Sequence, residues 1–172
     1  MARRTSLFVV RHAQALPRSD WDGPDGDRPL SKRGHKQAWE LTRWLALTHP
    51  SRVVSSPAMR CVETVTPLAA KSDLSVELDA RLVEAGPSDE LDDPDIAMRL
   101  AGRAEKVIGE CLDIDKTLVV CSHGDVIPCW LELVRVRDGV NVIPARCAKG
   151  SVWELSWDGR RFVKAQYHKP SA

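Results

Sequence analysis

With 172 residues, 43% of them hydrophobic and 28% charged, the chain has the length and composition of one domain, residues 1–172, with a substantial core. Its formal net charge of +1 and lack of a basic tail exclude the charge pattern of a nucleic-acid binder. The apolar run after the basic N-terminus is too short for a signal peptide or a membrane span. Five cysteines without a C-x-x-C pair are typical of reduced thiols, so we expect a cytoplasmic protein that does not bind membranes.

The first predicted strand is the apolar run 7–10, which ends abruptly in Arg11 and His12. A long polar stretch, residues 14–28, follows it. A loop of this length in a compact domain is usually functional or disordered. Because it directly follows the predicted site, we favour a loop that covers the site, with an ordinary solvated loop as the alternative.

Two helices and a second strand are predicted next. Ser31 is the expected N-cap of a helix that ends before Pro50. The strand 52–54 leads into Ser56, which we expect to cap a second helix with proline at its first position. Arg60 then projects from the first turn, where free backbone N–H groups favour anions. Pro67 should kink or end this helix.

The second half of the chain repeats this alternation. A short strand at 74–78 precedes an acidic stretch, 79–93, that contains Glu84, and Asp93 then opens a third helix. A central strand, 117–121, ends in Ser122-His123-Gly124, after which Asp125 can cap a helix that runs to about residue 134.

The C-terminal part predicts a β-hairpin, because Asp158-Gly159 separates two alternating runs, 151–157 and 160–167. Strands that alternate with helices and close with a hairpin predict an α/β fold. We expect a three-layer sandwich with a central mixed, mostly parallel sheet. In such sheets ligands bind at the carboxyl ends of the strands. Three strand ends that deliver arginine and histidine therefore predict one small, positively charged pocket.

Two arginines and two histidines in one pocket suit attack on a phosphate dianion. Arginine stays charged and its planar fork matches phosphate oxygens. Histidine can be neutral and nucleophilic near pH 7. A carboxylic acid is needed to protonate the leaving oxygen and later to activate water, and Glu84 is the best-placed candidate. A metal site is the rival interpretation, but no third ligand has metal spacing and the arginines would repel a cation.

These segments resemble the motifs of the histidine phosphatase superfamily, which has the phosphoglycerate-mutase-like fold. Residues 7–13 resemble its R-H-G signature, with Ala13 in place of the usual glycine, and 28–34 resemble its helix start. Residues 55–64 are similar to its SSPxxRxxxT segment, and Ser122-His123-Gly124 matches its second histidine. The short SixA-type branch is most similar, as is the phosphatase domain of actinobacterial Nudix-fused nucleotide hydrolases.

The resemblance implies a metal-independent phosphomonoester hydrolase that needs no cofactor. His12 would be the nucleophile and Glu84 the proton donor, while Arg11, Arg60 and His123 would hold the phosphoryl oxygens. A solvated acidic loop remains the alternative for Glu84.

Gln14 and Lys149 are candidate substrate contacts, with plain solvated side chains as the alternative. Expected substrates are a protein phosphohistidine, a nucleoside phosphate or a small phosphorylated metabolite, and the oligomeric state is left open. The alternative function is a catalytically weak phosphoprotein-binding or regulatory domain that retains the anion pocket.

Overall fold

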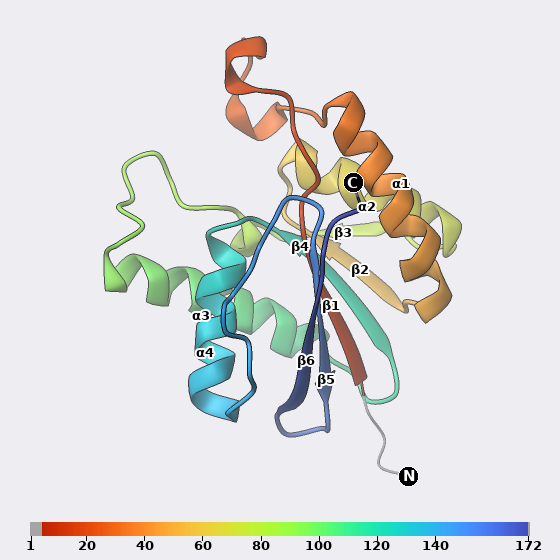
Figure 1. The fold of residues 1–172 in the computed structure, drawn as a ribbon, viewed down its shortest axis with the longest axis vertical. Coiled ribbons are helices and arrows are strands. Elements are labelled where there is room, and N and C mark those ends of the chain that lie inside the picture. Colours follow the sequence, from red (N-terminus) through yellow and green to blue (C-terminus); the bar gives the residue numbers. More distant parts are fainter. Residues whose placement is uncertain (1–4, 172) are drawn as a thin grey trace.

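The computed structural model describes residues 5–171, in which one six-stranded sheet carries helices on both faces (Figure 1). The strands are β1 (Thr5–Arg11), β2 (Arg52–Ser55), β3 (Val76–Leu78), β4 (Thr117–Ser122), β5 (Val152–Trp157) and β6 (Phe162–His168). The α-helices are α1 (Lys32–Leu45), α2 (Met59–Lys71), α3 (Pro94–Cys111) and α4 (Val126–Asp138). Within the described range, no helix has the length and hydropathy needed to span a bilayer.

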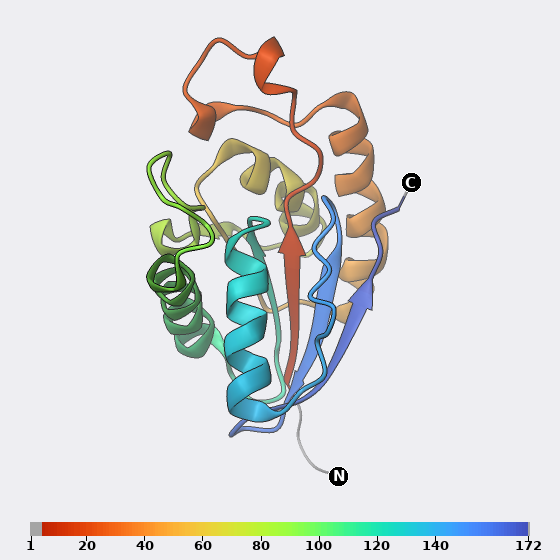
Figure 2. The ribbon, with the colours of Figure 1, turned by 60° about the vertical axis from the view of Figure 1, so that its left-hand side comes forward.

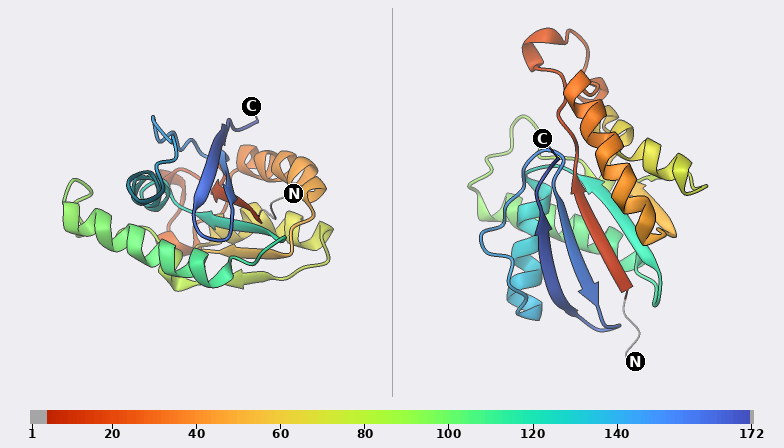
Figure 3. Two further views of the ribbon diagram at one scale, coloured as in Figure 1. Left: turned by 90° about the horizontal axis from the view of Figure 1, so that it is seen from below. Right: turned by 45° about the vertical axis from the view of Figure 1, so that its right-hand side comes forward.

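The sheet has the order β3-β2-β4-β1-β5-β6. The first four strands in this order are mutually parallel, whereas β5 is antiparallel to β1 and forms a hairpin with β6 (Figure 3). Helices α1 and α2 cover one face, and α3 and α4 cover the other. This arrangement confirms the predicted mixed, mostly parallel sheet within three layers.

Strand β1 shows why its sequence reads as a continuous apolar run. Leu7 and Val9 pack into the core beneath α3 and α4, whereas Phe8 and Val10 pack into the core beneath α1 and α2. Successive strand residues point to opposite faces, and a parallel sheet covered on both faces buries both sets. The run ends where the sheet ends, and polar side chains begin there.

The register of the parallel strands aligns their carboxyl ends. Arg11 pairs with Ser122 across β1 and β4, and the backbone N–H of His12 donates to the Ser122 carbonyl at 3.0 Å. On the other side of β4, the N–H of Ser56 donates to the Cys121 carbonyl at 3.0 Å. The residues that leave β1, β2 and β4 are therefore held side by side at one edge of the sheet.

Most helix starts agree with their sequence signals. Ser31 caps α1 by accepting from the N–H of Gly34, Asp93 caps α3 and Asp125 caps α4. Helix α4 runs one turn beyond its predicted end, because its next natural stop is Gly139, which has a φ of 73°. The strands of the hairpin are separated by residues 158–161, which is longer than the two predicted turn residues.

The predicted start of α2 was wrong, and of the two outcomes expected at Pro67, a kink or an end, the helix does not end there. Its N-cap is Ala58, which offers no side-chain cap, because the Ser56 hydroxyl is engaged with a residue of another strand end. The helix also continues through Pro67 to Lys71 rather than ending there. Leu68 and Ala69, which follow the proline, are buried in the core, and this packing outweighs the lost backbone hydrogen bond.

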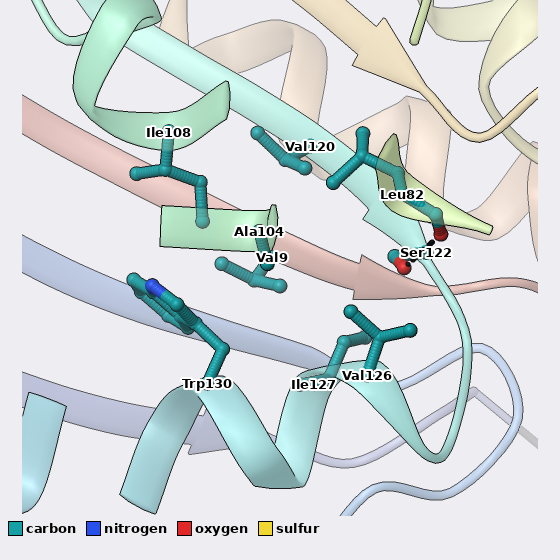
Figure 4. A pocket seen from close by; sticks show the side chains of 9 residues that line it. All are labelled: Val9, Leu82, Ala104, Ile108, Val120, Ser122, Val126, Ile127 and Trp130. Atoms are coloured by element: carbon teal, nitrogen blue, oxygen red, sulfur yellow. Dashed lines mark hydrogen bonds between the residues drawn. The ribbon is translucent and has the colours of Figure 1, made fainter. Parts of the chain in front are cut away.

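The core beneath α3 and α4 reaches up to the edge that carries the polar residues. A void of about 10 Å³ lies there, and Figure 4 shows the side chains that line it, most of them apolar and from β1, β4, α3 and α4. Ser122 lies at its rim and donates its hydroxyl to the Leu82 carbonyl at 2.8 Å. The void is too small for a substrate, and the hydrogen bond ties the end of β4 to the segment that leads to Glu84.

Candidate active site

A cleft of about 420 Å³ opens at the carboxyl ends of the parallel strands. The predicted loop 14–28 extends above β1 and forms part of its wall (Figure 2). The lining residues are Arg11, His12, Gln14, Ala15, Leu16, Pro17, Arg18, Arg28, Arg60, Glu84 and Lys149. Residues 14–18 and 28 of the loop therefore line the cleft, and so do six of the seven predicted site residues.

His12 is buried at the base of the cleft, with 5% of its surface exposed. Its Nδ1 lies 2.7 Å from the Ala13 carbonyl oxygen, which can only accept a hydrogen bond. Nδ1 therefore carries the proton, and Nε2 keeps its lone pair. Burial, followed by the charges of Arg60 and Arg11, lowers the pKa of His12 to about 4 against the opposing Ala13 hydrogen bond. The ring is neutral and nucleophilic at pH 7.

His123 lies beside His12, with 5.4 Å between the ring centroids. Its Nε2 lies 2.9 Å from the Ser56 hydroxyl, whereas its buried Nδ1 has no hydrogen-bond partner. Burial, followed by the charges of His12, Arg60 and Arg11, lowers the pKa of His123 to about 2. The 3.5 Å approach of Nδ1 to Glu84 is consequently not an ion pair at neutral pH.

Arg11 is held between the backbone and a glycine. Its Nη1 donates to the Cys147 carbonyl, while its buried Nε has no partner. A Cβ at Gly124 would lie 2.5 Å from the guanidinium carbon of Arg11, so a larger residue here would displace the guanidinium. Two of the three buried, unpartnered side-chain polar atoms found within residues 5–171, Arg11 Nε and His123 Nδ1, thus belong to this site. Unsatisfied buried donors of this kind require an explanation, and a bound anion would satisfy both.

Arg60 is almost completely buried and contacts two acids. Its Nη2 forms an ion pair with Glu84 and approaches Asp25 Oδ2 at 3.2 Å, while its Nη1 donates to the Asp25 carbonyl at 2.7 Å. The neighbouring Arg28 also binds Asp25, at 2.9 Å. Asp25 thus attaches the loop 14–28 to the arginines of the cleft.

Glu84 lies at the edge of the cleft with a half-buried carboxyl group. Burial raises its pKa, the carboxylates of Asp125 and Asp25 act in the same direction, and Arg60 opposes them. A carboxyl group with a raised pKa that lies beside the two histidines has the properties of a proton donor.

Gln14 and Lys149 line the outer part of the cleft. The backbone N–H of Gln14 donates to Gln37 Oε1 at 3.0 Å. Lys149 forms no ion pair with any residue in the range 5–171, and burial together with Arg11, Arg28 and Arg60 lowers its pKa. A cation without a partner among other cations indicates a place for negative charge.

Sequence reasoning missed three residues of the site. Ser56 was read as a helix cap, Asp25 lay unremarked in the polar loop, and Thr64 accepts from the N–H of Ala13 at 2.9 Å and so fixes the turn after His12. Position next to a strand end could have marked Ser56. No local pattern marks Asp25, because its partners are distant in the chain. Thr64 lies in the family-like segment 55–64, but that resemblance gave it no role of its own.

The comparisons with known proteins agree with this geometry. Residues 7–106 match the family described as the histidine phosphatase superfamily (branch 1). The chain belongs to this superfamily.

Its relatives include enzymes with different names. An 8-oxo-(d)GTP phosphatase of Mycolicibacterium smegmatis is 31% identical over 96% of the chain, which spans only 48% of that protein. A mycobacterial glucosyl-3-phosphoglycerate phosphatase solved with VO3 has 22% identity and a TM-score of 0.71, with 98% of each chain covered. A crystal structure described as the phosphohistidine phosphatase SixA of Agrobacterium tumefaciens has 18% identity and a TM-score of 0.68, with 99% of this chain and 100% of that one covered. The last two similarities concern the fold alone.

Proposed function

We propose that the protein hydrolyses phosphomonoesters through a covalent phosphohistidine on His12. The observation that carries this proposal is the pairing of a free Nε2 lone pair on a neutral, buried His12 with two unpartnered buried donors, Arg11 Nε and His123 Nδ1. A phosphoryl group bound here would satisfy both donors while its phosphorus is exposed to Nε2. Fixed donors and cations aimed at developing charge are the main source of catalysis in phosphoryl transfer.

The first step transfers the phosphoryl group to the enzyme. Nε2 of His12 attacks phosphorus, the bond from phosphorus to the leaving oxygen breaks, and Glu84 gives its proton to that oxygen. In the second step water attacks the phosphohistidine, Glu84 takes a proton from the water, and the N–P bond breaks to release inorganic phosphate. Arg11, Arg60 and His123 hold the phosphoryl oxygens throughout. The scheme uses no metal and no cofactor.

The outer cleft favours substrates that carry negative charge beyond the phosphoryl group. Lys149 has no acidic partner among residues 5–171, and Gln14 also lines this cleft. A nucleoside phosphate or a small phosphorylated metabolite with a second anionic group fits these residues. The similarity to an 8-oxo-(d)GTP phosphatase makes oxidised nucleotides a first choice for a substrate panel, beside sugar phosphates and phosphohistidine peptides.

The decisive experiment measures turnover of a chromogenic aryl phosphate in excess chelator. The native protein should retain its activity, and His12→Ala should lose it. His35→Ala, which replaces an exposed histidine of α1, is the matched control and should be fully active. Brief reaction with radiolabelled substrate should label the native protein with acid-labile, alkali-stable phosphate. Phosphate binding without turnover would instead favour a phosphoprotein-binding domain, and turnover by His12→Ala would refute the mechanism.

The role of Glu84 is tested by leaving groups of different basicity. Glu84→Gln should slow release of a poorly acidic alcohol by about 10²–10⁴, the usual contribution of a general acid. Release of nitrophenol, which needs no proton, should be less affected. Glu90→Gln changes an exposed carboxylate of the same acidic segment and should behave like the native protein. Equal turnover of poor leaving groups by Glu84→Gln and the native protein would show the assignment to be wrong.

A further inference from the structure

We infer that Ser56 is a positioning residue that fixes the tautomer of His123, so that its proton lies on Nδ1 and faces the phosphoryl site. This inference rests on the proposed function, which gives His123 its phosphoryl oxygen to bind. It assigns a task to a residue that the sequence marks only as the cap of a helix. The position of the Ser56 hydroxyl proton decides between the two neutral tautomers of His123.

Ser56 and His123 meet at the ends of neighbouring strands. Both are buried, with 0% and 1% of their surfaces exposed, and Ser56 Oγ lies 2.9 Å from His123 Nε2. The backbone of Ser56 is fixed by its hydrogen bond to the Cys121 carbonyl in β4, the strand that leads to His123. The sheet itself therefore sets this contact, and neither side chain has solvent as an alternative partner.

Counting donors and acceptors gives the direction of the hydrogen bond. Ser56 Oγ accepts a long contact from the N–H of Ala58, at 3.4 Å. Its own proton then needs an acceptor, and within residues 5–171 its remaining hydrogen-bond partner is His123 Nε2. If Ser56 donates to Nε2, that nitrogen carries a lone pair. The neutral ring must then hold its proton on Nδ1.

The surroundings of Nδ1 favour the same tautomer. Among residues 5–171, Nδ1 is buried without a hydrogen-bond partner, and Glu84 Oε2 lies 3.5 Å from it. When substrate is bound, a lone pair on Nδ1 would face phosphoryl oxygens and be repelled by them, whereas a proton on Nδ1 would be attracted to them. The lowered pKa of His123 keeps the ring neutral, so the choice is between two neutral tautomers.

Cys61 is the other group near Nε2, at 3.5 Å from its Sγ. The thiol lies 3.8 Å from the Ser122 carbonyl and donates its own proton there. Sulfur is a weak acceptor and leaves the Ser56 hydroxyl as the stronger partner of Nε2. Cys61 therefore packs against the imidazole without deciding where its proton lies.

The consequence is a neutral donor that is ready before substrate arrives. The orientation of a histidine proton is often set by the hydrogen bond that the other ring nitrogen makes. Without Ser56, either tautomer is open to His123, and the form with a bare Nδ1 repels the transferring phosphoryl group. The loss should appear mainly in kcat, because charge on the phosphoryl oxygens has to be stabilised during transfer.

The first test is the native protein without substrate. Labelling its histidines with ¹⁵N and recording long-range ¹H–¹⁵N correlations distinguishes a protonated from an unprotonated ring nitrogen. His123, assigned by comparison with His123→Asn, should show a protonated Nδ1 and an unprotonated Nε2. A protonated Nε2 in the native protein would overturn the inference. This outcome is independent of turnover, so it is distinct from failure of the phosphatase proposal, which His12→Ala decides.

The second test compares variants. Ser56→Ala should convert part of the His123 population to the Nε2–H tautomer and lower kcat roughly tenfold or more, below the loss of about 10²–10³ seen when a transition-state donor is removed outright. Ser55→Ala is the matched control, since its buried hydroxyl donates to the Ser56 carbonyl and does not touch the histidine. Ser56→Thr, which keeps the hydroxyl, should restore the native tautomer.

An unchanged tautomer and native kcat in Ser56→Ala would overturn the proposal. If Ser56→Ala does not fold, Ser56→Cys replaces it, because a thiol has nearly the same shape and donates weakly. The native tautomer with native kcat in Ser56→Cys would overturn the proposal in the same way.

Discussion

Because Gly124 has no side chain, the guanidinium group of Arg11 can lie directly against its backbone. A Cβ at this position would lie 2.5 Å from the guanidinium carbon of Arg11, and the guanidinium would have to move. Gly124→Ala should therefore weaken inhibition by inorganic phosphate and lower kcat/KM by roughly tenfold or more, as expected when a bound cation is misplaced. Inhibition constants for phosphate measure the effect directly.

The control for this change is a glycine with free space around it. Gly102 lies in α3, and a Cβ there would have no neighbour within 4 Å. Gly102→Ala should bind phosphate as the native protein does and should raise the free energy of unfolding by about 0.5–1 kcal/mol, because alanine favours helix. Native phosphate affinity in Gly124→Ala would show that Arg11 adapts or does not bind the anion.

The lowered pKa of His12 predicts how stability depends on pH. The folded value of about 4 lies below the reference of 6.5, so between these pH values the unfolded chain binds the extra proton. The stability that this group contributes is fully present above pH 6.5. It is lost as pH falls from 6.5 to 4, by up to about 1.4 kcal/mol per pH unit.

Urea unfolding at pH 7 and pH 5 measures this loss. The native protein should be less stable at pH 5, and His12→Asn should reduce the difference. His123, whose pKa is also lowered by burial, adds a second proton in the same direction. An NMR titration of the His12 ring should have its midpoint near pH 4. A midpoint near 6.5 would contradict both the burial of the ring and the stability prediction.

At the scale of elements, α1 supports the cleft through its first turn. The Ser31 hydroxyl accepts from Gly34 N–H at 3.1 Å and donates to the Gln14 carbonyl at 3.0 Å, so the same group caps the helix and holds the cleft loop. Ser31→Ala should cost about 1 kcal/mol of stability and also lower kcat/KM. Thermal unfolding and aryl phosphate turnover separate the two effects.

The matched change is Asp93→Ala, which removes the cap of α3 on the other face of the sheet. It should cost a similar free energy of unfolding while turnover is preserved. Equal turnover in the two variants would show that the loop does not depend on the cap of α1.

The same scale shows what the sequence could predict. Buried parallel strands are recognisable in the sequence as apolar runs, and these runs end where the sheet ends. Arg11, His12 and His123 could therefore be placed at one edge of the sheet. Glu84 lies in a segment without periodicity, and it was singled out by the need for a carboxylic acid at the site together with the family resemblance. Ser56 carries a local cap signal that a partner 67 residues away in the chain overrides. The continuation of α2 through Pro67 likewise follows from tertiary packing, which local propensity does not contain.

The whole molecule has a net charge of only +1, but positive charge is concentrated in the cleft. The cleft is lined by Arg11, Arg18, Arg28, Arg60 and Lys149, with Glu84 as the one acid in its lining. A cleft of one sign concentrates substrates of the other sign and does so less at high salt. The value of kcat/KM for a substrate with two anionic groups should fall as ionic strength rises.

Lys149→Ala should reduce this salt dependence and raise KM more for the doubly anionic substrate than for an aryl phosphate. Lys71→Ala, at the far end of α2, changes the net charge equally and should leave both unchanged. Equal effects of the two lysines would indicate that the overall charge acts, and not a cation in the cleft.

The interior position of β1 has a consequence for biosynthesis. This strand precedes both of its neighbours in the sheet, residues 117–122 on one side and 152–157 on the other. A nascent chain adds about 5–20 residues per second, so for seconds the segment with His12 has no strand to pair with. Ribosomes that stall before the hairpin would release chains with an apolar, unpaired edge, which invites aggregation. His12 thus gains its setting in the sheet only after residues 152–157 have been made.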